Sequence, residues 1–233
     1  MSDSLQPSEE IMRVEALGVE HRATFIVRTY KHLFGAILAF TLLEILFFKS
    51  GLAEPIARSL LSVNWLLVLG GFIVVSWLAS RVAHTAESLS LQYFALSAFV
   101  VAEAIIFVPL LFIANYYAPG AIKSAATLTL AGFTGLTGIA FMMRKDFSFL
   151  GAFLRWAMVL ALVAIVGGVL FGFHLGTWFS VAMVGLAGAA ILYDTSNIIH
   201  HFPEDRYVGA ALELFASVAL MFWYVLSLFI SRD

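Results

Sequence analysis

Seven long apolar segments, each of roughly 20 residues, constrain the fold of this chain more than any other feature. A helix needs about 20 apolar residues to cross roughly 30 Å of hydrocarbon, so each segment is long enough to span a membrane. The pattern predicts an all-α polytopic membrane protein, a seven-transmembrane-helix bundle, with a polar tail at residues 1–27 and a membrane domain at residues 28–233. The predicted spans are residues 30–48, 64–82, 88–113, 121–143, 149–171, 178–199 and 208–230.

The composition excludes several other classes of protein. Hydrophobic residues make up 62% of the chain and charged residues 12%, against about 25% charged in soluble domains. The connections between the spans are too short for a nucleotide-binding domain, which excludes an ATP-driven pump within this chain. A net charge of −2 without a basic stripe gives no footprint for nucleic acid. The absence of cysteine excludes thiol catalysis and thiolate metal sites.

The distribution of Lys and Arg predicts the orientation of the chain. The tail and the even-numbered connections carry nine basic residues, whereas the odd-numbered connections and the C-terminus carry four. Basic residues are enriched on the cytoplasmic side of membrane proteins. We therefore expect a cytoplasmic N-terminus and an external C-terminus, and we see no cleavable signal peptide at the start of the chain.

Four acidic residues interrupt the predicted spans: Glu44, Glu103, Asp194 and Glu213. Their positions predict two layers, with Asp194 and Glu213 about one and a half turns from the cytoplasmic surface and Glu44 and Glu103 deeper. A carboxyl group at membrane depth is costly and marks a functional candidate, here for a cation or proton path. The alternative is that each acid is protonated and hydrogen-bonded across helices, or lies at a hydrated interface.

Arg81 ends the second predicted span at about the depth of Asp194. Its guanidinium could pair with Asp194 and close the cytoplasmic mouth until the acid is protonated or a competing cation arrives. The alternative is an arginine that extends to the membrane interface. The sequence leaves both open.

No complete catalytic set is present, so we expect no enzyme and no cofactor. The chain has no Gly-x-Ser-x-Gly motif, and Tyr193-Asp194 lacks the second aspartate motif of intramembrane aspartyl proteases. A zinc site with His84 is disfavoured because the adjacent His200 and His201 point about 100° apart on a helix. The two histidines are more typical of a titratable pair at the cytoplasmic interface.

Four segments resemble, in order, the motifs of the Bax inhibitor family, also called transmembrane Bax inhibitor motif proteins, in its bacterial branch. The similarity runs from about residue 25 to the C-terminus. It rests on the segment that begins Phe25-Ile26-Val27-Arg28, on Arg144-Lys145-Asp146-Phe147-Ser148, on Ile191-Leu192-Tyr193-Asp194-Thr195, and on Ala211-Leu212-Glu213-Leu214-Phe215.

The resemblance implies a seven-helix protein of the bacterial inner membrane with a pH-sensitive calcium leak. In the leak members an aspartate on each of the last two helices shares a proton, and an arginine at the end of the second helix latches the first aspartate. Asp194 and Arg81 match that aspartate and that arginine, but Ser217 stands where the second aspartate would be. Glu213 lies one turn before Ser217 on the same face and is the alternative partner for Asp194.

Two function hypotheses follow from these residues. The first is a pH-sensitive cation leak in which Asp194 is the sensor, Arg81 the latch, Glu213 and Ser217 the partners, and Glu44 and Glu103 an outer layer. Calcium would be the permeant ion, with Asp194 and Glu213 as a weak calcium contact. The alternative, which the missing second aspartate favours, is a non-conducting regulator of a membrane-anchored AAA protease or another membrane complex. Its oligomeric state stays open.

Overall fold

The computed structural model describes residues 13–14 and 18–231 and has an all-helical architecture. Seven of the eight helices in the described part are long and apolar enough to cross a membrane, which confirms the predicted class. The helices are α1 (Val19–Lys49), α2 (Ala53–Ser62), α3 (Trp65–Thr85), α4 (Leu89–Tyr117), α5 (Ala121–Met143), α6 (Leu150–Phe171), α7 (Gly176–His200) and α8 (Tyr207–Ile230).

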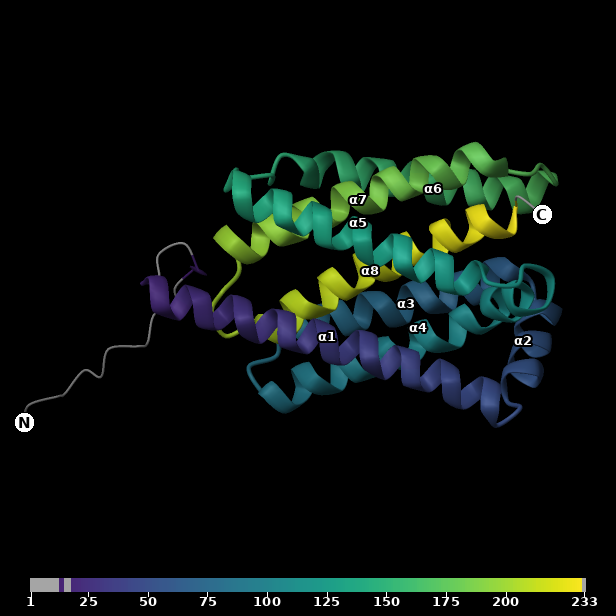
Figure 1. Cartoon of the computed structure of the whole chain (residues 1–233), viewed down its shortest axis with the longest axis horizontal. Coiled ribbons are helices and arrows are strands. Elements are labelled where there is room, and N and C mark those ends of the chain that lie inside the picture. Colours follow the sequence, from purple (N-terminus) through teal and green to yellow (C-terminus); the bar gives the residue numbers. More distant parts are fainter. Residues whose placement is uncertain (1–12, 15–17, 232–233) are drawn as a thin grey trace, which may run out of the picture.

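Helix α8 lies at the centre of the bundle. It packs against α1, α3, α4, α5 and α7, and half of its apolar window is buried. Helices α1 to α4 lie on one side of α8 and helices α5 to α7 on the other (Figure 1). The two groups contact each other only sparsely, so α8 supplies most of the core between them.

Two features of the fold differ from the predicted spans. Helix α1 begins at Val19, eleven residues before the predicted apolar run, because the charged and polar residues that follow Val19 are also helical. Helix α2 was expected to be part of a connection; its buried Ala53 and Ala57 instead pack against Val108 of α4. Most of the predicted tail at residues 1–27 lies outside the described residues.

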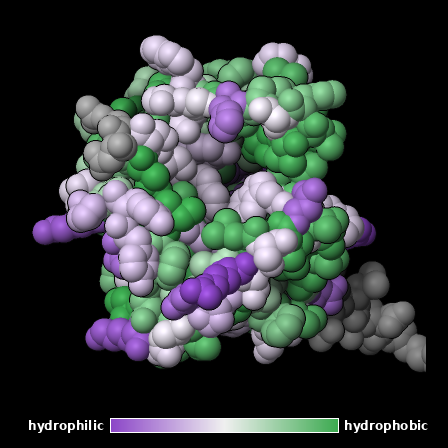
Figure 2. All heavy atoms as spheres, turned by 90° about the vertical axis from the view of Figure 1, so that its right-hand side faces the viewer, coloured by the Kyte–Doolittle hydropathy of each residue, from purple (hydrophilic) through white to green (hydrophobic). Residues whose placement is uncertain are grey.

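The exterior of the bundle fits a protein surrounded by lipid. Large apolar side chains such as Leu67, Trp156 and Phe171 are exposed on its flanks, where a bilayer would cover them. Helix α1 begins at one end of the bundle and α8 ends at the other, as an odd number of spans requires (Figure 1). Figure 2 shows hydrophilic side chains scattered among hydrophobic ones over the end where α8 ends.

Candidate functional site

The candidate site lies where α7 packs against α8, the most extensive contact between helices in the bundle. Asp194 of α7 and Ser217 of α8 are both 8% exposed, and the Ser217 hydroxyl donates a hydrogen bond of 2.5 Å to Asp194 Oδ2. A buried carboxyl group is costly unless it is hydrogen-bonded. The structure therefore brings together two of the predicted site residues, with a serine as the partner of the aspartate.

Glu213 lies one turn before Ser217 and has a different partner. Its Oε1 is 2.9 Å from His84 Nε2 of α3. His84 Nδ1 is 2.7 Å from the Ser80 carbonyl oxygen, which can only accept, so Nδ1 carries a proton. Nε2 and a carboxylate oxygen would then both be acceptors unless a proton lies between them. A hydrogen bond between His84 and Glu213 therefore requires that one of the two groups carries a proton at this position.

Arg81, the predicted latch, does not pair with Asp194 in the described structure. The Arg81 guanidinium is exposed and lies 5.2 Å from the centre of the Trp77 ring; among the described contacts it forms no ion pair with Asp194. Arg206 is the buried guanidinium at this end of the bundle. It donates to the Ala86 carbonyl and pairs with Asp205 at 3.2 Å.

Two cavities lie near the Asp194–Ser217 pair. One, of about 450 Å³, is lined by His84, Asn197, His201 and Glu213 and opens at the end of the bundle where α8 begins. The other, of about 550 Å³, is lined by Glu103 and Ser217 and lies between α3 and α6. Ser217 thus shares the deeper cavity with Glu103, and Glu213, one turn away on α8, lines the mouth.

Glu44 and Glu103 were predicted to form one outer layer, but the structure brings them to different cavities. Glu44 lines a cavity of about 410 Å³ between α1 and α5, on the opposite side of α8 from the cavity that Glu103 lines. Both side chains are more than nine-tenths buried. In the described part of the chain, no cluster of three or more His, Cys, Asp or Glu side chains could hold a metal ion.

The connection between α5 and α6 attaches to the mouth through Asp146. Its Oδ2 is 2.9 Å from His201 Nε2, and its Oδ1 accepts from the Ser148 backbone N–H at 2.8 Å. This backbone N–H, together with the weaker contribution of His201, lowers the pKa of Asp146. The Phe147 backbone N–H donates to Ser196 Oγ at 2.9 Å, which makes a second attachment to α7.

A short N-terminal segment attaches to the same end of the bundle. Val14 is fully buried, and its N–H donates to the Phe202 carbonyl at 3.0 Å in the turn between α7 and α8. Arg22 Nε of α1 donates to the Val14 carbonyl at 3.2 Å. Val14 is therefore bound to Phe202, a residue that lines the mouth.

Sequence reasoning missed three residues of this end: Arg206, His84 as the partner of Glu213, and His201 as the partner of Asp146. His84 was weighed only as a zinc ligand. The sequence did hold a signal for these residues: all three stand beside predicted membrane boundaries on the cytoplasmic side, the side of Glu213 and Asp146. Which of these side chains contact each other depends on how each helix is rotated about its axis. The hydrophobic periodicity of this chain does not predict that rotation, because the spans are apolar on nearly every face.

Comparison with known proteins places this arrangement in a family. Residues 22–233 match the model of a family described as "Inhibitor of apoptosis-promoting Bax1". Relatives include the "Modulator of FtsH protease YccA" of Escherichia coli (strain K12), which is 37% identical over 95 residues, covering 39% of this chain and 42% of the relative. A protein of Escherichia coli O6:H1 named "Inner membrane protein YccA" matches to the same extent.

A plant protein, "Protein LIFEGUARD 4" of Arabidopsis thaliana, is 34% identical over 116 residues, covering 46% of each chain. The chain therefore spans less than half the length of these relatives. The family match, by contrast, covers nearly the whole described chain and all seven membrane spans. The chain belongs to the Bax inhibitor family, the inhibitors of apoptosis-promoting Bax1.

Proposed function

We propose that the chain is a non-catalytic regulator of a membrane-anchored protease in the bacterial inner membrane. The observation that carries the proposal is the partner of Asp194. A single carboxyl group closed by the Ser217 hydroxyl at 2.5 Å cannot share a proton between two carboxyl groups, as the leak mechanism of this family requires. The similarity to a modulator of the FtsH protease supports the same function.

The region that precedes α1 is the proposed docking element. The Val14–Phe202 and Arg22–Val14 hydrogen bonds hold the start of the described chain at the end of the bundle where the basic residues gather. A truncation that removes residues 1–12 leaves these contacts in place. Loss of binding in that variant would then report on docking rather than on unfolding of the bundle.

The test is co-reconstitution of the purified full chain with the E. coli FtsH protease in lipid nanodiscs. We expect the two proteins to co-purify, and we expect the chain to change the rate at which the protease degrades a membrane-protein substrate. Removal of residues 1–12 should abolish both effects, whereas Asp194→Asn should preserve them. Failure of the full chain to co-purify or to alter degradation would overturn the proposal.

A second candidate, the pH-sensitive cation leak, is favoured by one observation. Ser217, which donates to Asp194, lines the cavity that holds Glu103, and Glu213, one turn away on α8, lines the mouth that holds His84. In this proposal Asp194 is the sensor and calcium the permeant ion, and opening requires the hydrogen bond to break.

Calcium flux into liposomes, measured against pH, tests the leak. We expect flux that changes with pH and loses that dependence in Asp194→Asn. Asp146→Asn is the matched control, because Asp146 is an acid at the same end of the bundle but lies in a connection between helices. Absence of flux at every pH, or an unchanged profile in Asp194→Asn, would exclude this candidate.

A further inference from the structure

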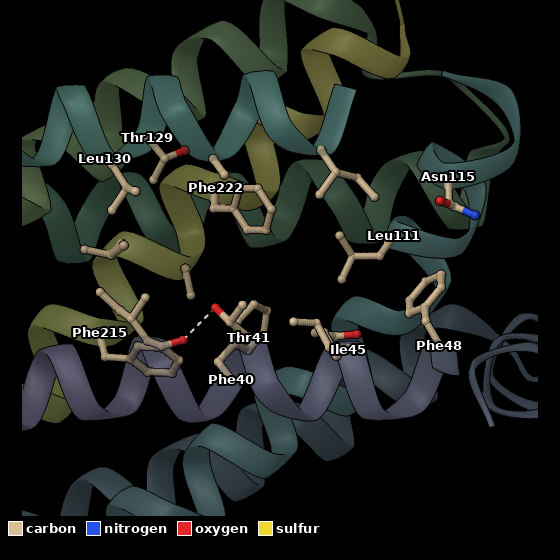
Figure 3. Close-up of a pocket in the computed structure, with 16 residues that line it drawn as sticks. Phe40, Thr41, Ile45, Phe48, Leu111, Asn115, Thr129, Leu130, Phe215 and Phe222 are labelled. Atoms are coloured by element: carbon tan, nitrogen blue, oxygen red, sulfur yellow. Dashed lines mark hydrogen bonds between the residues drawn. The ribbon is translucent and has the colours of Figure 1, made fainter. Parts of the chain in front are cut away.

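The cavity between α1 and α5 has no role in the functions proposed above. It measures about 410 Å³, within the range of about 300–1,000 Å³ typical of small-molecule sites. Its lining is mostly apolar and comes from α1, α4, α5 and α8. Figure 3 shows Phe40 and Ile45 on α1 facing Thr129 and Leu130 on α5 across the cavity, with Phe222 of α8 behind them.

Two buried polar groups in this cavity have no partner. Both carboxyl oxygens of Glu44 and the hydroxyl of Thr129 are buried without a hydrogen bond in the described structure, and the two residues are 7% and 3% exposed. Neighbouring threonines on α5 behave differently: Thr127 and Thr134 donate to carbonyls one turn earlier in the helix. Thr41, in the same cavity, does likewise at 2.8 Å (Figure 3).

An unpaired carboxyl group in an apolar cavity carries a large desolvation cost, which a ligand can offset. A divalent metal ion does not fit, because calcium takes six to eight oxygen ligands and the cavity supplies one carboxylate among apolar walls. A fatty acid would bring a second carboxyl group beside that of Glu44 and no cation to pair with it. A cationic nitrogen on an apolar chain would pair with the Glu44 carboxylate, and its chain would pack against the apolar walls.

The cavity is accessible from the side of the bundle. Helices α1 and α5 touch near the start of α1, where the Tyr30 ring lies against Phe133 and Phe141. Beside the cavity their backbones stay apart in the described structure, and α8 forms the floor between them. The side chains of Thr41, Ile45 and Leu130 line the opening and are exposed. Glu44 lies five residues before the end of α1, which places it about 8 Å from that end along the helix axis. A ligand dissolved in the bilayer can therefore enter laterally.

We propose that this cavity is a binding site for a lipophilic amine, whose ammonium group pairs with Glu44 and hydrogen-bonds to Thr129 while its apolar chain lies between α1 and α5. The site is separate from the Asp194–Ser217 pair, neither member of which lines this cavity. Its occupant is defined by its chemistry: one basic nitrogen at the end of an unbranched apolar body.

Photo-crosslinking in nanodiscs of phosphatidylcholine tests the proposal. The probes are dodecylamine carrying a diazirine and the dodecanol analogue with the diazirine at the same carbon, and mass spectrometry locates the labelled peptides. We expect the amine to label α1 and α5 strongly in the full chain and the alcohol to label them weakly. Glu44→Gln should reduce amine labelling about tenfold, which corresponds to about 1.4 kcal/mol.

Two further variants separate recognition from folding. Glu54→Gln alters an exposed acid of α2 that pairs with Arg58 and should leave labelling unchanged. Ala126→Trp fills the cavity while it retains Glu44, and it should abolish labelling by both probes. Equal labelling by amine and alcohol, or amine labelling that persists in Glu44→Gln or in Ala126→Trp, would overturn the proposal.

Discussion

At the scale of single residues, the central fact is that the buried Asp194 carboxyl group accepts a hydrogen bond from one hydroxyl group, that of Ser217. Ser217 donates to it from the facing helix, and both side chains are buried. The nearby Glu213, which sequence reasoning offered as a second partner, is instead in contact with His84.

We predict that Ser217→Ala lowers the free energy of unfolding by about 1–3 kcal/mol, the usual cost of leaving a buried acceptor unsatisfied. Thermal denaturation of the purified protein in detergent measures the loss. The matched control is Ser231→Ala, which removes an exposed hydroxyl whose only described bond is to the Ser227 carbonyl. Equal losses in the two variants would show that the hydrogen bond to Asp194 contributes no more to the free energy of unfolding than an exposed hydroxyl group does.

The residues of this site could be predicted only in part. Asp194 and Glu213 could be predicted because an acid inside an apolar span is visible in the sequence. Ser217 was predicted because the family resemblance places it where the second aspartate would be, and i, i+4 spacing places Glu213 on the same face. Arg81 and Arg206 both stand at the ends of spans, and the sequence does not show which of them turns inward. That choice depends on packing between α3, α4 and α8, which the local pattern does not encode.

At the scale of elements, the spans could be predicted because length and hydropathy define them; the α5 bounds, Ala121–Met143, match the predicted residues 121–143. Helix α2 could not, because its ten residues are too short for a span and include exposed charges such as Glu54 and Arg58. What stabilises α2 is its contact with α4, which is tertiary information.

The close approach of α3 and α8 gives a prediction about a glycine. A Cβ atom on Gly209 would lie 3.0 Å from the Ala83 carbonyl oxygen, a backbone atom that cannot move independently of its helix. We expect Gly209→Ala to separate α8 from α3 and to destabilise the protein by about 1–3 kcal/mol. Gly185→Ala, in a helix position with open space around it, should be neutral or slightly stabilising. Comparison of the two denaturation curves decides the point.

The attachment of the α5–α6 connection gives a prediction about pH. The Ser148 N–H and His201 lower the pKa of Asp146 below its ordinary value of about 4. The folded protein thus holds fewer protons at this site than the unfolded chain. The stabilisation is present above about pH 4 and is lost as the pH falls through the lowered pKa.

Because Asp146 is largely exposed, we expect Asp146→Asn to cost at most about 1 kcal/mol at neutral pH. Thermal denaturation between about pH 3 and pH 7 should show the wild type and Asp146→Asn diverging at neutral pH and converging in acid. A difference that instead grew as the pH fell would contradict the assigned sign.

At the scale of the whole molecule, the architecture separates two kinds of cavity. Helix α8 forms a wall of the cavity between α1 and α5 and of the cavity between α3 and α6, because the two groups of helices meet mainly through it. One opening holds Glu44 and the other holds Glu103 and Ser217. A variant that fills one cavity therefore leaves the other intact, so lipophilic amine binding and the leak can be tested separately.

The orientation of the bundle follows from the same view of the whole chain. Nine basic residues lie in the tail and the even-numbered connections and four on the opposite side, which predicts a cytoplasmic start for α1 and an external end for α8.

The chain has no native cysteine, so single cysteines can report on each side without background. Ser50, after α1, and Ser88, before α4, are both exposed and lie at opposite ends of the bundle. With a membrane-impermeant maleimide on right-side-out spheroplasts, Ser50→Cys should be labelled at once and Ser88→Cys only after permeabilisation. The reverse pattern would invert the bundle and place the His84–Glu213 mouth outside the cell, which would remove the basis for docking a cytoplasmic protease domain there.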